Sequence, residues 1–315
     1  MITLLLLIYF FYRFFAPIIV SFTGLFYIFL FFLLLFLQVL FFTTCERKLL
    51  ALTQRRLGPR VVGDRGRLQF LADALKLITK TFFSPKKANG IFFQNAAIAA
   101  FWFSWLAFSN LVFDYGTDIL EVEYNIFFSI ACSMGFGSAW IVAGWAAVSK
   151  YALLGCIRAG IQIISYELIS SLVFLSIFTI VNSPNYELLS DVQEYQSILL
   201  FVPSCIIFLY LGILMETNRP PFDLSEAESD VVSGYTVEYA GILFGLFYLG
   251  EYVSLFTTCL MLSISYWGAW WSIFVYFGYL LKFILIFFFV DGIQQSYITF
   301  FTSFCNSVNY ILFEW

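Results

Sequence analysis

Long apolar stretches separated by short polar segments are the main pattern along this 315-residue chain. A helix that crosses a membrane needs about 20 apolar residues, and the sequence supplies such stretches repeatedly. We predict spanning helices at 22–44, 91–113, 125–147, 151–181, 197–215, 239–262 and 268–290, with 297–313 as a weaker candidate. The pattern therefore indicates an all-α fold, a polytopic bundle of seven to eight transmembrane helices.

The two ends differ from this core. Residues 1–21 are apolar but are interrupted by Arg13 and Pro17, and they lack the small-residue cleavage site of a secretory signal. We interpret them as an N-terminal extension that forms an interfacial or half-inserted helix. Residues 22–290 form the membrane core, and 291–315 form a divergent tail or a degenerate eighth helix.

Composition supports this interpretation and narrows the chemistry. Only 11% of the residues are charged, whereas soluble domains carry roughly 25%. The chain has no histidine, which excludes imidazole acid–base catalysis and histidine-ligated metals or haem. Its six cysteines are far apart and include no C-x-x-C pair for zinc or an iron–sulfur cluster. Proton chemistry would therefore depend on carboxylates, Lys, Tyr or water.

The distribution of Lys and Arg predicts the orientation of the chain. The segment 47–87 holds 11 of the 16 basic residues, and basic loops remain on the negative side of a membrane. The loops 114–124, 182–196 and 263–267 contain no Lys or Arg, as expected for the opposite side. The acidic loop 216–238 has the same parity as the basic one, so we expect both loops on one face.

The second half of the basic loop, 64–82, has the pattern of an amphipathic helix at the membrane surface. Its apolar positions cluster within about 80° of arc, at 100° per residue, and they are Leu68, Leu71, Leu75, Ile78 and Phe82. The polar positions lie roughly opposite, at Gln69, Asp73, Lys76 and Lys80. Two interpretations are open: a face that anchors the helix in lipid, and a lid that covers the entrance of a cavity.

Charged residues also occur inside the predicted spans, at Arg158, Glu167, Glu251 and Lys282. A charge at the centre of a spanning helix costs on the order of 3 kcal/mol, so such residues usually face protein or a water path. On an ideal helix Arg158, Gln162 and Ser165 share one face and Glu167 points the opposite way. These charges indicate either interhelical pairing or a hydrated path for protons or ions.

Three segments carry a resemblance to a known family. They are ERKLLALTQRRLGPRVVGDRGRLQFLADALKLITK (46–80), GWAAVSKYALLGCIRAGIQIISYEL (144–168) and ETNRPPFDLSEAESDVVSGYTVEYAG (216–241). Together they resemble the signature stretches of the subunit 1 family of respiratory complex I, NADH:ubiquinone oxidoreductase. The resemblance covers about 46–290, in register with the family's first seven helices.

The resemblance implies that ubiquinone is the substrate and that this chain forms most of the chamber through which the quinone headgroup moves. The residues that it implies for quinone binding are Glu46, Arg47, Arg56, Asp73, Arg219, Phe222, Asp223, Glu226 and Glu228. Those that it implies for proton coupling are Arg158, Gln162, Glu167, Glu216, Asp230, Glu238, Glu251 and Lys282. It implies no NAD, flavin, haem or iron–sulfur cluster on this chain.

The resemblance also implies partners and a location. The partners would be peripheral-arm subunits that carry the terminal iron–sulfur cluster, small and antiporter-like membrane subunits, and lipids, with no nucleic acid. The location would be the mitochondrial inner membrane, with loops 46–87 and 216–238 on the matrix side.

The tail departs from the family pattern, because 291–315 lacks the basic loop that precedes the family's last helix. Either 297–313 is a degenerate eighth helix or, as we favour, a separate polypeptide supplies that helix. Two other functions remain as alternatives: the related membrane subunit of an energy-converting hydrogenase, and a stand-alone ion transporter.

Overall fold

The computed structural model describes a helical bundle, and the described residues contain no strand. Those residues are 29, 32–33, 35–48, 50–51, 54–81, 83–111, 122, 124–181, 184–195, 203–216, 218, 222, 232 and 234–267. Its elements in chain order are η1 (Asp64–Gly66), α2 (Gln69–Thr79), α3 (Gly90–Ser109), α4 (Asn125–Ala146), α5 (Lys150–Val181), α6 (Tyr186–Tyr195), α7 (Pro203–Glu216), η3 (Gly234–Glu238) and α9 (Ile242–Trp267). A further helix, not labelled in the figures, includes residues 35–48.

Four of the described helices are long and apolar enough to cross a membrane: α3, α4, α5 and the part of α9 from Ile242 to Leu262. They confirm the predicted helices at 91–113, 125–147, 151–181 and 239–262. Parts of two further predicted spans, 22–44 and 197–215, are also helical. The predictions for 1–21, 268–290, 291–315 and 297–313 lie outside the described residues.

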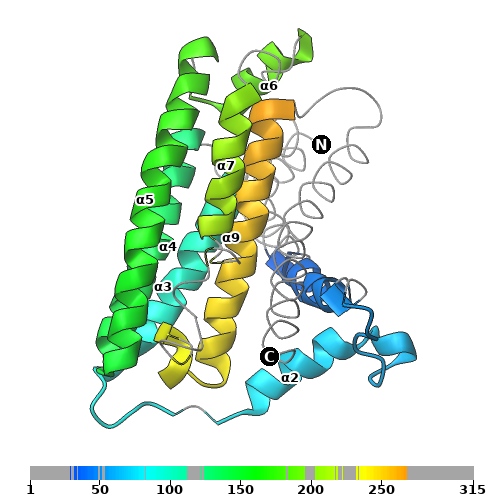
Figure 1. Cartoon of the computed structure of the whole chain (residues 1–315), viewed down its shortest axis with the longest axis vertical. Helices are drawn as coiled ribbons and strands as arrows, with labels where there is room; N and C mark the ends of the chain where they lie inside the picture. The colour runs from blue at the N-terminus through cyan, green and yellow to red at the C-terminus, as the bar shows by residue number, and fades with distance from the viewer. Residues whose placement is uncertain are drawn as a thin grey trace, which may run out of the picture.

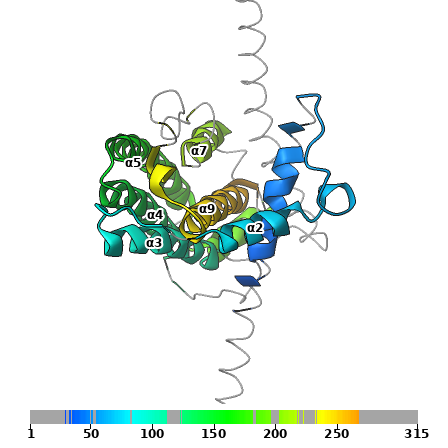
Figure 2. The same cartoon turned by 90° about the horizontal axis from the view of Figure 1, so that it is seen from below.

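Helix α9 lies at the centre of the arrangement. Figure 1 shows α3, α4 and α5 side by side, and α9 packs on α3 and α7. The end-on view in Figure 2 shows α2 lying across one end of the bundle, near α9. In the most apolar stretch of α9, 67% of the residues are buried, compared with 39–44% in α3, α4 and α5. Helix α9 is therefore largely enclosed by protein, whereas the other three leave broad faces for lipid.

Small residues allow the helices to approach closely. Alanines line the contact between α3 and α4, including Ala97 and Ala100 on one helix and Ala143 on the other, and all three are fully buried. Lipid is as apolar as leucine, so close van der Waals packing, rather than exclusion from water, holds such helices together. At Gly155 of α5 an added Cβ would lie 2.6 Å from the Cα of Gly234, so η3 lies directly against α5.

The predicted loop 182–196 is wrong in part, because α6 occupies Tyr186–Tyr195. Tyr186 and Leu189 are fully buried, and Gln193 donates from Nε2 to the carbonyl oxygen of Ser265 at 2.6 Å. These residues follow the i, i+3, i+7 spacing of a helix that buries one face. The sequence prediction used the lack of Lys and Arg in 182–196 only to assign a side of the membrane, and it overlooked this helical spacing.

The predicted amphipathic helix over 64–82 is shorter in the structure. Its first residues form the 3-10 turn η1, and α2 extends from Gln69 to Thr79. Gly63, Arg65 and Gly66 all have positive φ angles, of 72°, 53° and 74°. Left-handed backbone of this kind interrupts a helix, so α2 begins only after this turn.

Candidate functional site

The largest cavity among the described residues lies between α2, α9 and the helix that contains residues 35–48. Its volume is about 520 Å³, which is within the range of small-molecule sites. The lining is mostly apolar and includes Phe36, Val39, Leu40, Phe70, Leu77, Phe244 and Leu249, with Arg47, Asp73 and Lys76 as its charged members. Such a cavity suits a ligand that has a long apolar part and one small polar end.

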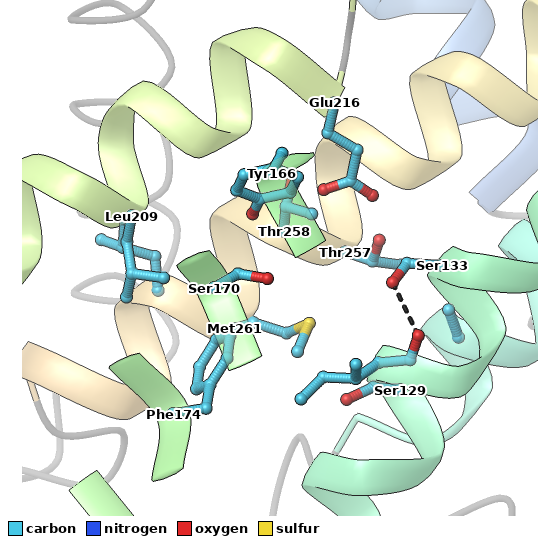
Figure 3. Close-up of a pocket in the computed structure, with 13 residues that line it drawn as sticks. Ser129, Ser133, Tyr166, Ser170, Phe174, Leu209, Glu216, Thr257, Thr258 and Met261 are labelled. Carbon is cyan, nitrogen blue, oxygen red and sulfur yellow. Dashed lines mark hydrogen bonds between the residues drawn. The ribbon is translucent and has the colours of Figure 1, made fainter. Parts of the chain in front are cut away.

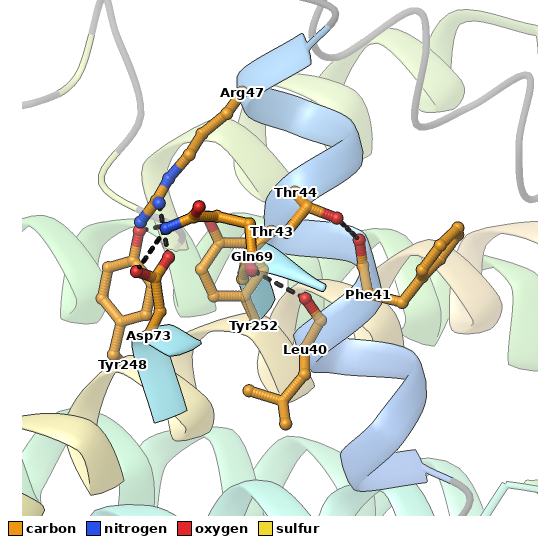
Figure 4. Close-up of polar contacts among 9 residues, drawn as sticks. All are labelled: Leu40, Phe41, Thr43, Thr44, Arg47, Gln69, Asp73, Tyr248 and Tyr252. Carbon is orange, nitrogen blue, oxygen red and sulfur yellow. Dashed lines mark hydrogen bonds and ion pairs between the residues drawn. The ribbon is translucent and has the colours of Figure 1, made fainter. Parts of the chain in front are cut away.

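An ion pair joins two walls of this cavity. Arg47 donates from Nη1 to Asp73 Oδ2 at 2.6 Å, and Gln69 donates from Nε2 to the other carboxylate oxygen at 3.0 Å. Figure 4 shows Arg47 reaching from its helix to Asp73 on α2. Partial burial acts to lower the pKa of Arg47, but the hydrogen bond and charge of Asp73 outweigh this effect, so the pKa is raised overall. The guanidinium therefore stays charged and holds α2 over the cavity.

The neighbouring Glu46 lies in a different environment. Its side chain is buried and accepts a hydrogen bond from the hydroxyl of Tyr252 on α9 at 2.6 Å. The hydroxyls of Tyr248 and Tyr252 lie 3.3 Å apart, and both tyrosines approach Asp73 and Arg47 in Figure 4. Polar groups of three distant segments thus converge at one end of an otherwise apolar cavity.

Helix α2 uses a different face for the cavity than its sequence pattern suggested. The predicted apolar face is exposed at Leu68, Leu71 and Leu75, and Phe82 lies outside the described residues. The face over the cavity combines Phe70, Ala74 and Leu77 with Asp73 and Lys76, and Ile78 is the one described member of the predicted apolar face that also borders the cavity. The helix therefore covers the cavity with a mixed face and leaves a separate apolar face for lipid.

A second cavity of about 280 Å³ adjoins the first along α9 and shares Phe244 and Tyr248 with it. Its lining adds Tyr235, Thr236, Val237, Phe247 and Glu251. The two shared rings lie 6.0 Å apart, with 23° between their planes. The lining residues of the two cavities together extend from α2 to Glu251 and η3.

Two carboxylates predicted for proton coupling lie inside the bundle. Glu167 of α5 and Glu216 of α7 are only 2% and 3% exposed. Figure 3 shows Glu216 beside Tyr166 and Thr258, in a cavity that is also lined by Ser129, Ser133, Ser170 and Thr257. Its volume is about 30 Å³, which is enough for about one water molecule. Glu216, the last residue of α7, therefore lies beside the middle parts of α5 and α9. The sequence had predicted it in a loop at the membrane face.

Other predicted site residues lie elsewhere. The side chains of Arg56 and Arg158 are exposed, those of Glu238 and Glu251 are half-buried, and Gln162 is buried. Phe222 packs against the larger apolar core. Six predicted site residues lie outside the described residues: Arg219, Asp223, Glu226, Glu228, Asp230 and Lys282.

Sequence reasoning missed the aromatic residues of α9 that line the cavities, Phe244, Phe247 and Tyr248, and the neighbouring Tyr252 that bonds to Glu46. In a chain that is 22% aromatic, rings at these positions resemble ordinary lipid-facing residues. One sequence signal could have identified them: Tyr248 and Tyr252 lie close to Glu251 in the chain. Hydroxyl groups beside a carboxylate are uncommon in a membrane-spanning helix.

Metal ligands are not grouped in the described part of the chain, where no three His, Cys, Asp or Glu residues are placed to hold an ion. Three of the described cysteines, Cys132, Cys156 and Cys259, are buried as apolar residues. The cavities therefore provide apolar and hydrogen-bonding surface, together with the charges of Arg47, Asp73 and Lys76.

Comparison with known proteins gives consistent matches. A family model described as NADH dehydrogenase matches residues 26–300. NADH-ubiquinone oxidoreductase chain 1 of Arabidopsis thaliana is 40% identical over 236 residues, which cover 74% of this chain and 72% of the relative. The protein of the same name from Paramecium tetraurelia is 39% identical over 228 residues, with 72% and 87% covered. An NADH-quinone oxidoreductase subunit of Paramagnetospirillum magneticum is 40% identical over 238 residues, with 74% and 69% covered.

Proposed function

This chain belongs to the NADH dehydrogenase family, and on that premise we propose that it is the membrane subunit that guides ubiquinone in an NADH:ubiquinone oxidoreductase. The matched relatives are named as parts of quinone oxidoreductases. This favours the proposal over the hydrogenase and transporter alternatives. The chain would take part in the enzyme as a subunit, with ubiquinone as the substrate of the assembled complex.

The cavity beneath α2 is the observation that carries the proposal. A quinone has a flat ring with two carbonyl oxygens and an apolar isoprenoid tail. The apolar lining from Phe36 to Leu249 suits the tail, and Arg47 and Tyr248 provide hydrogen-bond donors for a carbonyl oxygen. The adjoining cavity extends this passage toward Glu251. Glu46, Arg47 and Asp73 keep their proposed place at the quinone site, and Arg56 would act from the exposed surface beside it.

The coupling role rests on the interior carboxylates. Glu216 lines a cavity between α4, α5, α7 and α9 that is rich in hydroxyl groups, and the buried Glu167 follows Tyr166 of its wall. Carboxylates so placed could exchange protons when quinone reduction alters the charge nearby. Glu251 lines the second cavity, and Glu238 ends η3, three residues of which also line it. We propose that these two carboxylates link the quinone cavities to the interior carboxylates. The same role is proposed for Arg158, Asp230 and Lys282.

We propose that the chain resides in the mitochondrial inner membrane, with the basic and acidic loops on the matrix side. Its partners would be peripheral-arm subunits with the terminal iron–sulfur cluster, together with small and antiporter-like membrane subunits. A separate polypeptide would supply the last helix.

Photoaffinity labelling of the assembled complex tests the quinone site. A ubiquinone analogue with a photoreactive group on its tail should label peptides from 36–47, 70–78 and 242–249, because these segments line the cavity. A quinone-site inhibitor should reduce that labelling. Labelling confined to the lipid-facing surfaces of α3, α4 and α5, or unaffected by the inhibitor, would contradict the proposal.

A further inference from the structure

Gln162 joins the middle of α5 to the end of α7. Its side-chain nitrogen donates to the carbonyl oxygens of Met215 and Phe222, at 2.8 and 2.9 Å, and to Asn218 Oδ1 at 3.1 Å. The side chain is 9% exposed. Gln162 is the thirteenth residue of α5, so these contacts lie about 18 Å along the helix from Lys150.

The chemistry of the acceptors fixes the orientation of this amide. Two of the three partners are backbone carbonyl oxygens, which can only accept hydrogen bonds, so the NH₂ group must face them. With two hydrogens for three acceptors, the bond to Asn218 is shared. Gln162 Oε1 and Asn218 Nδ2 are buried with no hydrogen-bond partner among the described residues. The NH₂ group of Gln162 is therefore fully used at the end of α7, whereas the side-chain oxygen of Gln162 is left without a hydrogen bond among the described residues.

The last carbonyls of a helix have no partner within that helix. The carbonyl oxygen of Met215, directly before Glu216, accepts a hydrogen bond from the Asn218 N–H at 3.4 Å, and Gln162 from another helix adds a shorter second one. Asn218 follows with a φ of 47°, a left-handed conformation that Asn tolerates better than most residues. One turn further along α5, the ring of Tyr166 lies beside Glu216 (Figure 3). Gln162 and Tyr166 thus hold both the backbone and the side chain at the end of α7.

We propose that Gln162 is a positioning residue that fixes the end of α7, together with Asn218 and Phe222, inside the bundle. It thereby keeps Glu216 in the interior cavity. This role differs from the place in the proton path that the family resemblance gave to Gln162. The contact between Gln162 and the end of α7 is given by the geometry alone. The effect that we expect on quinone reduction rests on the proposed function.

Hydrogen exchange in the assembled complex, without quinone, tests the contact directly. Gln162→Met keeps the length of the side chain and removes the donor. We expect the amides of the 214–222 peptide to exchange at least about tenfold faster, because the carbonyls of Met215 and Phe222 lose the hydrogen bonds that tie this segment to α5. Ser165→Ala is the matched control, since within the described part of the chain the Ser165 hydroxyl bonds to the carbonyl of Gln162 on its own helix and to no other helix. Unchanged exchange in Gln162→Met would overturn the proposal.

Kinetics of the same complexes separate positioning from proton transfer. In Gln162→Met we expect kcat for quinone reduction to fall about tenfold and KM for a short-chain ubiquinone to stay within about twofold, because Gln162 lines neither quinone cavity. The number of protons moved per NADH oxidised should not change. A lower proton number with unchanged exchange would make Gln162 part of a proton path and overturn the proposal. Faster exchange with normal quinone reduction would support the contact and count against the proposed function.

Gln162→Asn provides a second variant in case Gln162→Met does not assemble. It retains the amide donor but is one methylene shorter, so we expect exchange between that of wild type and that of a complete loss of the contact. An assembled Gln162→Asn complex with wild-type exchange would contradict the proposal.

Discussion

Glu46 and Arg47 are neighbours in the chain but act in different places. Successive residues of a helix point about 100° apart, so Glu46 faces inward and Arg47 faces α2. Glu46 is 7% exposed and bonds to Tyr252, whereas the side chain of Arg47 is 48% exposed and pairs with Asp73. An exposed ion pair contributes roughly 0.2–1 kcal/mol. We therefore attribute more stability to the buried bond of Glu46 than to the exposed pair of Arg47.

Tyr252→Phe should destabilise the bundle by about 1–3 kcal/mol, because it leaves a buried carboxylate without this donor. The ring contact between residue 252 and Phe42, at 6.4 Å, would be kept. The midpoint temperature for irreversible inactivation of the assembled complex measures the effect. Tyr151→Phe, at an exposed position of α5, should leave the midpoint unchanged. Equal midpoints for Tyr252→Phe and wild type would contradict this assignment.

The close packing of α7 on α5 depends on a glycine. Gly212 of α7 lies against the ring of Tyr166, and a Cβ at this position would lie 1.7 Å from the ring carbon Cε2. The ring of Tyr166 is buried, and the opening that the described residues leave beside it is the interior cavity of about 30 Å³, which is too small for the ring to move into. This glycine allows α7 to approach α5 closely enough for Gln162 to reach Met215.

Gly212→Ala should cost about 1–3 kcal/mol through overpacking, even though alanine is the better helix former. We expect less assembled complex on native gels and faster loss of the complex at elevated temperature. Gly90→Ala, at the start of α3 with no atom within 4 Å of the new Cβ, is the control and should assemble normally. A Gly212→Ala complex as abundant and as durable as wild type would show that α7 can move away from Tyr166.

The cavity beneath α2, which we propose as the quinone site, is a property of the whole molecule. Its walls come from residues 36–47, 70–78 and 242–249, which are separated by up to about two hundred positions in the chain. The helix of residues 35–48 and α9 form two sides, and α2 closes the third. The cavity forms only when all three segments are packed together.

Gly245→Trp should fill much of the cavity, because Gly245 lies on its wall opposite Leu77. We expect KM for a long-tailed ubiquinone to rise by at least about tenfold, or about 1.4 kcal/mol. Leu153→Trp adds the same ring on the exposed face of α5 and should leave KM unchanged. Normal KM in an assembled Gly245→Trp complex would indicate that ubiquinone takes another route.

The sequence alone predicted the helices at 91–113, 125–147, 151–181 and 239–262, because twenty apolar residues in succession have few other stable arrangements in a membrane. It also drew attention to Glu167 and Glu251, since a charge in a span is costly enough to require a reason. It did not predict α6, whose stability comes from burial of Tyr186 and Leu189 against distant helices. Nor did it reveal the roles of Phe244 and Tyr248, which resemble lipid-facing residues.

What the sequence determined by itself was the class of the protein, its principal helices and its family, because hydropathy and long motifs are local properties of the chain. Only the tertiary structure decided which side chains meet. It placed Asp73 with Arg47, Tyr252 with Glu46, and Gln162 with Met215. It also turned a mixed face of α2, rather than the apolar one, toward the cavity. Such contacts depend on how helices rotate and approach one another, and that is set by packing between residues far apart in the chain.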